Sequence, residues 1–115
     1  LDGDNIDNEG HGNINACSFN HNGTGIKANY IVLGYNINCC QIGFNTTFDV
    51  DIYHCGNGFV FTACNFNALG GCSIKVADYS VVLFKDTTFL GSLTSTIDAT
   101  SKVKGNGNTD GRINC

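Results

Sequence analysis

The stretch Ile14-Asn15-Ala16-Cys17-Ser18-Phe19 comes back three times along the chain, and this recurrence decides the fold. It returns as Ile37-Asn38-Cys39-Cys40-Gln41-Ile42, then as Phe61-Thr62-Ala63-Cys64-Asn65-Phe66, and then as Phe84-Lys85-Asp86-Thr87-Thr88-Phe89. The copies are 23 or 24 residues apart. A fixed period of this length is typical of repeat architectures, in which each copy stacks on the next.

Three positions stay apolar or small in every copy. They are the columns Ile14/Ile37/Phe61/Phe84, Cys17/Cys40/Cys64/Thr87 and Phe19/Ile42/Phe66/Phe89. The residue before each cysteine or its counterpart is Ala16, Cys39, Ala63 or Asp86. We predict that this residue lies at a tight bend between two strands, with the column residues on both sides of it pointing inward.

A second strand recurs in step with the first. Its copies are Gly25–Ala28, Asp49–Ile52, Ser73–Val76 and Thr96–Ala99, with the apolar column Ile26/Val50/Ile74/Ile97. Within each copy, apolar and polar residues alternate, as in a strand with one buried face. A third, less regular apolar segment covers 30–33, 58–60 and 80–83, and the closing residues 112–115 resemble the opening of a further rung.

These patterns predict an all-β protein, a right-handed parallel β-helix of about four to five rungs of 23–24 residues. No stretch keeps a 3.6-residue period for three turns, so helices are not expected. Residues 1–115 form a single domain, which we expect to be a fragment of a longer chain. The alternative is a β-sandwich of antiparallel hairpins, which explains short strands but not three columns held in one register.

Composition narrows the classes of function. The net charge is −4 and the six basic residues are scattered, which argues against nucleic acid as a partner. No window is apolar enough for a membrane span, and no signal peptide is visible. Seven cysteines cannot all pair within one chain, and their spacing does not suggest zinc. We expect reduced cysteines that act as small core residues, in a protein assembled in a reducing compartment.

With the repeated Ile-Asn-x-Cys-x-Phe motif and the Gly25-Ile26-Lys27 motif, the chain resembles bacteriophage tailspike proteins of the pectate-lyase-like β-helix superfamily. The resemblance covers Ile14 to Cys115. It implies a homotrimer on the virion, assembled in the cytoplasm of the host bacterium, that recognises a bacterial surface polysaccharide and often cleaves it. The calcium-binding Asp cluster of pectate lyases is missing, and no motif transfers catalytic residues one by one.

The outward column of the second strand is the main polar feature. It consists of Lys27, Asp51, Lys75 and Asp98, which alternate in sign. Stacked at strand spacing, these charges form either a surface salt-bridge ladder or a substrate-binding face for a glycan.

Asp49 and Asp51 are the candidate catalytic residues. They lie two apart on one strand, about 6.5–7 Å along it, which suits the general acid and base of an inverting glycosidase. The alternative is two solvated carboxylates flanking Val50.

Tyr53 continues this outward side and is a candidate ring for a sugar, with Tyr30, Tyr35 and Tyr79 as further candidates; ordinary packing is the alternative for each. His11, His21 and His54 lack metal spacing and are expected at the surface or at bends. Asp2–Asp7 fits a calcium loop poorly, and Gly105–Asn108 is expected to be a flexible loop. No metal and no cofactor are predicted.

Three functions therefore stay open. The first is a tailspike segment that recognises a bacterial surface polysaccharide, with cleavage by the parent protein left open. The second is a structural shaft without a site. The third is a fragment of a free-standing polysaccharide lyase or hydrolase.

Overall fold

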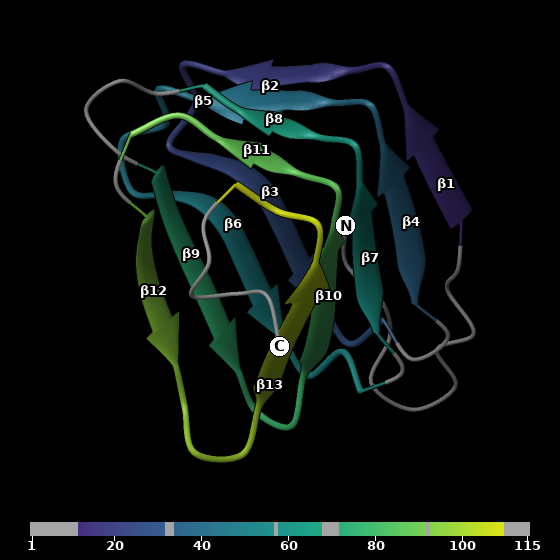
Figure 1. The fold of residues 1–115 in the computed structure, drawn as a ribbon. Helices are drawn as coiled ribbons and strands as arrows, with labels where there is room; N and C mark the ends of the chain where they lie inside the picture. Colours follow the sequence, from purple (N-terminus) through teal and green to yellow (C-terminus); the bar gives the residue numbers. More distant parts are fainter. Residues whose placement is uncertain (1–11, 32–33, 57, 68–71, 92, 110–115) are drawn as a thin grey trace.

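Three parallel sheets run along the molecule, and each of the first four described rungs contributes one strand to each sheet (Figure 1). The computed structural model describes residues 12–31, 34–56, 58–67, 72–91 and 93–109. Sheet B contains β1 (Gly12–Asn15), β4 (Tyr35–Asn38), β7 (Phe59–Thr62), β10 (Val81–Lys85) and β13 (Lys102–Asn106). Sheet C contains β2 (Ser18–Asn20), β5 (Gln41–Gly43), β8 (Asn65–Phe66) and β11 (Thr88–Phe89). Sheet A contains β3 (Thr24–Asn29), β6 (Phe48–Tyr53), β9 (Cys72–Ala77) and β12 (Leu93–Ile97).

The chain follows the same path in every rung, up through sheet B, across sheet C and down through sheet A (Figure 1). Each new rung is added in front of the previous one, so the coil is right-handed, as expected for parallel crossovers. The predicted parallel β-helix is therefore confirmed. The described residues contain no helix with the length and hydropathy that a membrane span requires.

The predicted columns coincide with the strand register. Ile14 pairs with Ile37, Ile37 with Phe61, and Phe61 with Phe84. In sheet C the partners run Phe19, Ile42, Phe66 and Phe89. In sheet A, Ile26 pairs with Val50 and Val50 with Ile74. Since like residues stack at strand spacing, the core is built from ladders of similar side chains.

The predicted bend is a single left-handed residue in each rung. Ala16, Cys39, Ala63 and Asp86 have φ angles of 54°, 54°, 51° and 50°. Each residue lies directly after its sheet B strand, and one further residue separates it from sheet C. Non-glycine residues seldom adopt these angles, because Cβ approaches the backbone. The rung-to-rung bonds Ala16 N to Asn38 O and Cys39 N to Thr62 O, both 3.0 Å, hold the corner in this conformation.

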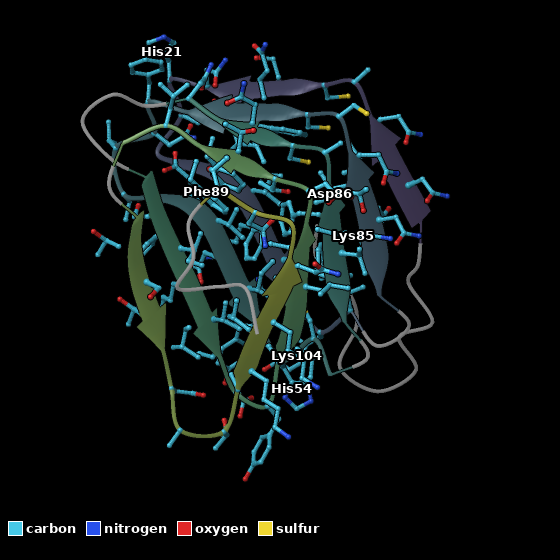
Figure 2. The ribbon with its side chains drawn as sticks, viewed as in Figure 1. His21, His54, Lys85, Asp86, Phe89 and Lys104 are labelled. Atoms are coloured by element: carbon cyan, nitrogen blue, oxygen red, sulfur yellow. The ribbon has the colours of Figure 1, made fainter. Side chains whose placement is uncertain are left out.

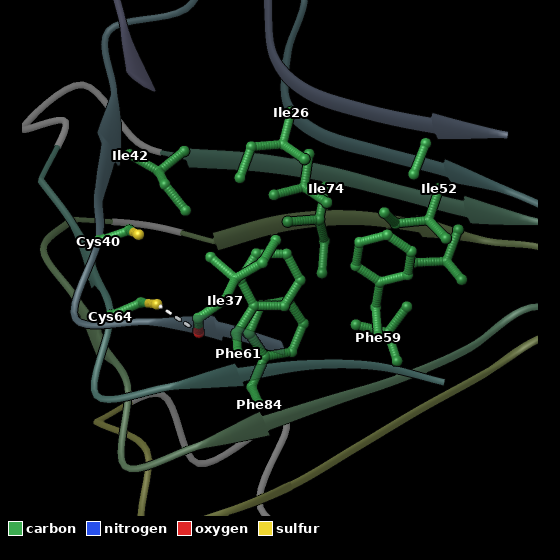
Figure 3. Close-up of a cluster of buried hydrophobic side chains, with 14 of the residues drawn as sticks. Ile26, Ile37, Cys40, Ile42, Ile52, Phe59, Phe61, Cys64, Ile74 and Phe84 are labelled. Atoms are coloured by element: carbon green, nitrogen blue, oxygen red, sulfur yellow. Dashed lines mark hydrogen bonds between the residues drawn. The ribbon is translucent and has the colours of Figure 1, made fainter. Parts of the chain in front are cut away.

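Aromatic ladders fill the centre of the coil. Phe61 stacks on Phe84 with centroids 4.9 Å apart, and Phe66 stacks on Phe89 at 4.8 Å. Phe61, Phe66 and Phe84 are fully buried, and burial of each such side chain contributes about 1.5–3 kcal/mol. Cys40 and Cys64 lie side by side next to this cluster, and the Cys64 thiol donates to Ile37 O at 3.2 Å (Figure 3).

The fourth copy of the second strand departs from the prediction. Ile97 was aligned with Ile74, but it pairs with Val76, and Ser95 pairs with Ile74. A shift of two residues leaves every side chain on the same face, so alternation alone does not distinguish the two registers. The shift follows from the connection between sheet C and sheet A, which is two residues shorter in this rung (90–92) than in the third rung (67–71).

The fifth rung also begins earlier than predicted. Residues 112–115, in which its opening was expected, lie outside the described residues. Instead, β13 pairs with β10, and Gly105 takes the place of a core phenylalanine opposite Phe84. Gly107 supplies the left-handed corner with φ of 70°, and the Asn108 side chain bonds Thr87 N and Phe84 O. The predicted flexible loop at Gly105–Asn108 is therefore wrong.

The third apolar segment is not a strand of its own. Val60 of segment 58–60 lies in β7, and Val81 of segment 80–83 lies in β10, so both belong to sheet B. Ile31 and Ser80, at the corners before sheet B, point into the core and are 3% and 0% exposed. The irregularity of this segment in the sequence reflects the variable corner between sheets A and B.

Candidate functional site

Sheet A carries the predicted polar column on its outer face. Lys27 pairs with Asp51, and Asp51 pairs with Lys75. The three predicted residues are thus neighbours at strand spacing, as expected. Lys75 Nζ lies 5.7 Å from the centre of the Phe48 ring, within range of a cation–π contact. The column therefore holds Lys75 over an aromatic face as well as beside a carboxylate.

Asp98, the fourth predicted member of the column, does not belong to it. Thr96 occupies the position opposite Lys75, because of the register shift in this rung. Asp98 follows β12 at the corner, where Oδ2 accepts a 2.7 Å bond from Asp78 N and Oδ1 accepts from Thr100 N and Thr100 Oγ1. The backbone N–H of Asp78 and the hydrogen bonds from Ser101 and Thr100 lower the pKa of Asp98 to about 2. Asp98 shapes this corner.

Asp49 does not face solvent beside Asp51. It is only 2% exposed, so the expected open pair of carboxylates is wrong for this residue. Asp49 Oδ1 accepts a 2.8 Å bond from Asn45 Nδ2, and Oδ2 accepts a 2.9 Å bond from Ser73 N in the next rung. Asp51 is half-buried on the outer face. The two carboxylates therefore occupy different environments, and Asp49 is engaged in holding two rungs together.

A cluster of polar and aromatic side chains gathers at the corner between sheet A and sheet B. We call it the aromatic corner and define it as Tyr30, Tyr53, His54, Asp78 and Tyr79. Tyr30, His54 and Asp78 have φ angles of 57°, 53° and 57°. The left-handed backbone turns the chain out of sheet A at the same point in successive rungs, so their side chains stack along the outside of the molecule. Figure 2 shows His54 at this corner and His21 at the other end of sheet A, where sheet C meets it.

Contacts within the aromatic corner join three rungs. The Tyr30 ring lies 5.7 Å from the Tyr53 ring in an edge-to-face arrangement, and 5.0 Å from the His54 ring. His54 Nδ1 lies 2.7 Å from Asp78 Oδ2. The negative charge of Asp78, and then its hydrogen bond with the phenol, raise the pKa of Tyr53.

The aromatic corner is open to solvent. Tyr79 is 66% exposed and Tyr53 is 39% exposed, so both rings are accessible. His54 and Asp78 are 48% and 33% exposed at their side chains. Ring faces, a phenol, an imidazole and a carboxylate are therefore all accessible on one edge. This combination offers stacking surfaces together with donors and acceptors.

The sequence contained a signal for this cluster that the strand columns did not use. Tyr30, His54 and Asp78 follow one another at intervals of 24 residues, the period of the rungs. His54 was expected only as a surface or bend residue. His54 does lie at a bend, but its contact with Asp78 was not predicted, because the orientation of side chains at a corner leaves no trace in the alternation of apolar and polar residues.

The remaining predicted side chains lie elsewhere. Tyr35 packs against the core, with its ring 5.8 Å from that of Phe59. His21 stacks on Phe44 at 5.4 Å, at the corner between sheets C and A. Residues 2–7 and His11 lie outside the described residues. Among the described side chains, no group of three or more His, Cys, Asp or Glu residues is arranged to hold a metal ion.

Comparison with protein-family models, with curated proteins and with solved structures finds no match for this chain. The β-helix is therefore interpreted from its own residues. The accessible rings and polar groups of the aromatic corner and the charged column of sheet A lie on neighbouring parts of its surface, since Tyr53 ends the strand that carries Asp51.

Proposed function

We propose that this β-helix recognises a bacterial surface polysaccharide as part of a phage tailspike. The exposed aromatic corner is the observation that carries the proposal. Pyranose rings present apolar C–H faces ringed by hydroxyl groups, and Tyr53 and Tyr79 present exposed rings next to donors and acceptors. The extended outer surface of a solenoid suits a long, repetitive ligand.

The charged column adds a polar extension to the proposed site. Lys27, Asp51 and Lys75 continue from Tyr53 along the outer face of sheet A. Charged groups here would bond sugar hydroxyls or an acidic substituent of the glycan. The predicted substrate-binding roles of Lys27, Tyr53 and Lys75 are therefore kept in the proposal, while Asp98 is assigned to the corner next to it.

The test is binding of the protein to immobilised bacterial capsular polysaccharides and lipopolysaccharide O-chains. We expect Tyr53→Ala and Tyr79→Ala each to weaken binding of the recognised glycan tenfold or more. Phe44→Ala is the matched control, because it removes another exposed ring, 47% exposed, at a different corner. Equal loss in all three variants, or no binding by the unmodified protein across the panel, would count against glycan recognition.

The tailspike proposal also includes a homotrimer on the virion. A parallel trimer of this chain has a mass of about 37 kDa, three times 12.2 kDa. Light scattering at several protein concentrations measures this mass directly. A monomer at all concentrations would contradict trimer formation by this segment, while leaving glycan binding by a single β-helix to the panel experiment.

A structural shaft is the second candidate function. Side-chain ladders between rungs favour it, such as the 2.9 Å bond from Asn38 Nδ2 to Asn15 Oδ1 on sheet B. Bonds of this kind stiffen the coil without forming a site. An absence of glycan binding together with a stable trimer would favour the shaft.

A cleaving function receives less support than recognition. The predicted catalytic pair requires two accessible carboxylates, but Asp49 is buried and bonded to Ser73 N. If the parent protein cleaves its glycan through this face, Asp51→Ala must reduce turnover. Unchanged cleavage in that variant would exclude Asp51 as a catalyst.

A further inference from the structure

Cys17 and Cys40 occupy equivalent positions in adjacent rungs. They lie between two paired positions, since Asn15 pairs with Asn38 before the corner and Ser18 pairs with Gln41 after it. Gln41 N donates to Cys17 O at 2.9 Å, and Cys17 N lies 3.4 Å from Cys40 Sγ. Neighbouring parallel strands are about 4.8 Å apart. This separation falls within the Cα–Cα range of about 4.4–6.8 Å that a disulfide spans.

The two thiols differ in access. Cys17 is exposed, whereas Cys40 is 1% exposed beneath it. A small disulfide in solution therefore meets Cys17 first. Once Cys17 is activated, the thiol that occupies the equivalent position in the next rung, with its Sγ 3.4 Å from Cys17 N, is that of Cys40. Both thiols are reduced in the structure.

We infer that Cys17 and Cys40 form an attacking and resolving thiol pair, which a low-molecular-weight disulfide such as oxidised glutathione converts into a cystine joining the first two rungs. The Cys17 thiolate attacks one sulfur of the small disulfide and releases one molecule of thiol. The Cys40 thiolate then attacks Cys17 Sγ and releases the second molecule of thiol. Two protein thiols are oxidised, and the small disulfide is reduced to two thiols.

The other described cysteines are poorly placed for this reaction. Cys64 continues the same column, but it is 2% exposed and stacks next to the buried Cys40 rather than next to an exposed thiol. Burial raises the pKa of Cys40 as well as that of Cys64, which it raises to about 11, so Cys40 is suited to the second step only through its position beside Cys17. Cys55 is fully buried at another corner, where its thiol donates to Tyr53 O at 3.3 Å and lies 3.8 Å from Ala28 O. Cys39 is exposed, but it is the left-handed corner residue, and its side chain lies outside the core column that Cys17 and Cys40 share. The position of Cys17 at the accessible end of the column makes it the entry point.

The disulfide between Cys17 and Cys40 would stabilise the edge of sheet B formed by β1. In the described sheet, β1 has β4 as its one neighbour and is the terminal strand. A covalent bond next to Asn15 and Asn38 ties β1 to the rung that follows. Since a terminal strand frays more easily than a central one, the bond should slow its opening.

The test is exposure of the native protein to oxidised glutathione, followed by alkylation, proteolysis and mass spectrometry. We expect a loss of two hydrogens and a peptide pair in which Cys17 is joined to Cys40. Cleavage after Lys27 separates the two cysteines, and Cys39→Ser shows which of the adjacent Cys39 and Cys40 takes part. In Cys40→Ser the reaction should stop midway, with glutathione retained on Cys17.

Cys17→Ser and Cys39→Ser are the matched pair of controls, because both remove an exposed thiol next to the same corner. Cys17→Ser should abolish the link, and Cys39→Ser should leave it intact. Amide exchange at Gly12–Asn15 should slow in the oxidised protein and return to its starting rate after reduction with dithiothreitol. A stable glutathione adduct on Cys17 of the unmodified protein, a link to Cys39, or unreacted thiols would each overturn the inference.

Discussion

Single residues in this chain fasten one rung to the next. Asn45 accepts from Asn22 N and donates to Phe19 O in the first rung, and it also donates to Asp49. Asp49 in turn accepts from Ser73 N in the third rung. Two side chains therefore connect three rungs. The sequence showed an acidic residue in an outward position, but not the asparagine that covers it, because a side-chain bond between strand and loop leaves no periodic trace.

Removing the Asp49 carboxylate should destabilise the fold. In Asp49→Ala, Ser73 N and Asn45 Nδ2 lose their acceptor in a buried place, which costs about 1–3 kcal/mol for an unsatisfied group. Asp51→Ala, two residues along the same strand, should change the free energy of unfolding by less than about 0.5 kcal/mol. Urea unfolding of both variants measures the difference. Equal stabilities would mean that the Asp49 contacts contribute nothing.

Asp98 should make folding depend on pH in the acid range. Its pKa is lowered from 3.8 to about 2, chiefly by the Asp78 N–H bond. Because the folded protein favours the ionised carboxylate, Asp98 contributes to the free energy of unfolding. This contribution to stability is complete above pH 3.8 and is lost as the pH falls toward 2. Titration of the Asp98 carboxyl carbon by NMR should give a midpoint near 2. Asp98→Asn should remove this part of the acid dependence, and a midpoint near 3.8 would contradict it.

Strands and corners were predictable to different degrees. The first corner of each rung was located in the sequence, because Ala16, Cys39, Ala63 and Asp86 recur between fixed apolar columns. The start of the fifth rung was misplaced at residues 112–115, since Gly105 stands where a phenylalanine or isoleucine was expected and Asn108 stands where a cysteine was expected. Asn108 continues the core column through hydrogen bonds to Thr87 N and Phe84 O, and as a polar residue it does not stand out in the apolar pattern of the sequence. Repeat periodicity therefore predicted strands whose ladders are apolar and failed where a ladder turns polar.

The first corner provides a test of backbone strain. Ala63 is exposed with φ of 51°, a conformation that costs an alanine about 1–2 kcal/mol. Ala63→Gly should stabilise the protein by about 0.5–1 kcal/mol, because the relief of strain exceeds the greater freedom of glycine in the unfolded chain. Ala63→Val should be destabilising. Ala99→Gly, at an exposed turn without a left-handed angle, is the control and should not stabilise; thermal unfolding compares the three.

The whole molecule depends on one continuous core that three sheets share. The predicted ladders account for most of it, since Phe61, Phe66, Phe84 and Phe89 stack in the order their spacing indicates. The aromatic corner was not predicted as a unit, although its positions follow the same period. Contacts across a corner depend on loop length and ring orientation, and neither is encoded in the alternation of apolar and polar residues.

Loss of a ring from the centre should weaken all rungs together. Phe84 stacks on Phe61 and meets Phe66 and Phe89 edge-on, with centroids 5.8 and 5.5 Å away. Phe84→Ala should lower the free energy of unfolding by about 3–5 kcal/mol through lost burial and the cavity left behind. Phe84→Leu, which fills most of the space, should lower it less. Tyrosine fluorescence and circular dichroism should report one coincident transition, and separate transitions would show that the rungs unfold independently.

The corners between sheets differ in how much their length varies from rung to rung, and this difference bears on how the sequence can evolve. Two residues separate sheet B from sheet C in all four rungs that have both strands, at 16–17, 39–40, 63–64 and 86–87. The corner from sheet A to sheet B spans 30–34, 54–58, 78–80 and 98–101, and so ranges from three to five residues. The corner from sheet C to sheet A spans 21–23, 44–47, 67–71 and 90–92 and covers the same range. Insertions and deletions should therefore accumulate at these two corners, one of which carries the aromatic corner, rather than between sheets B and C. The surface proposed to bind the glycan therefore lies where residues can be inserted, deleted or replaced without changing the stacking of core side chains between rungs.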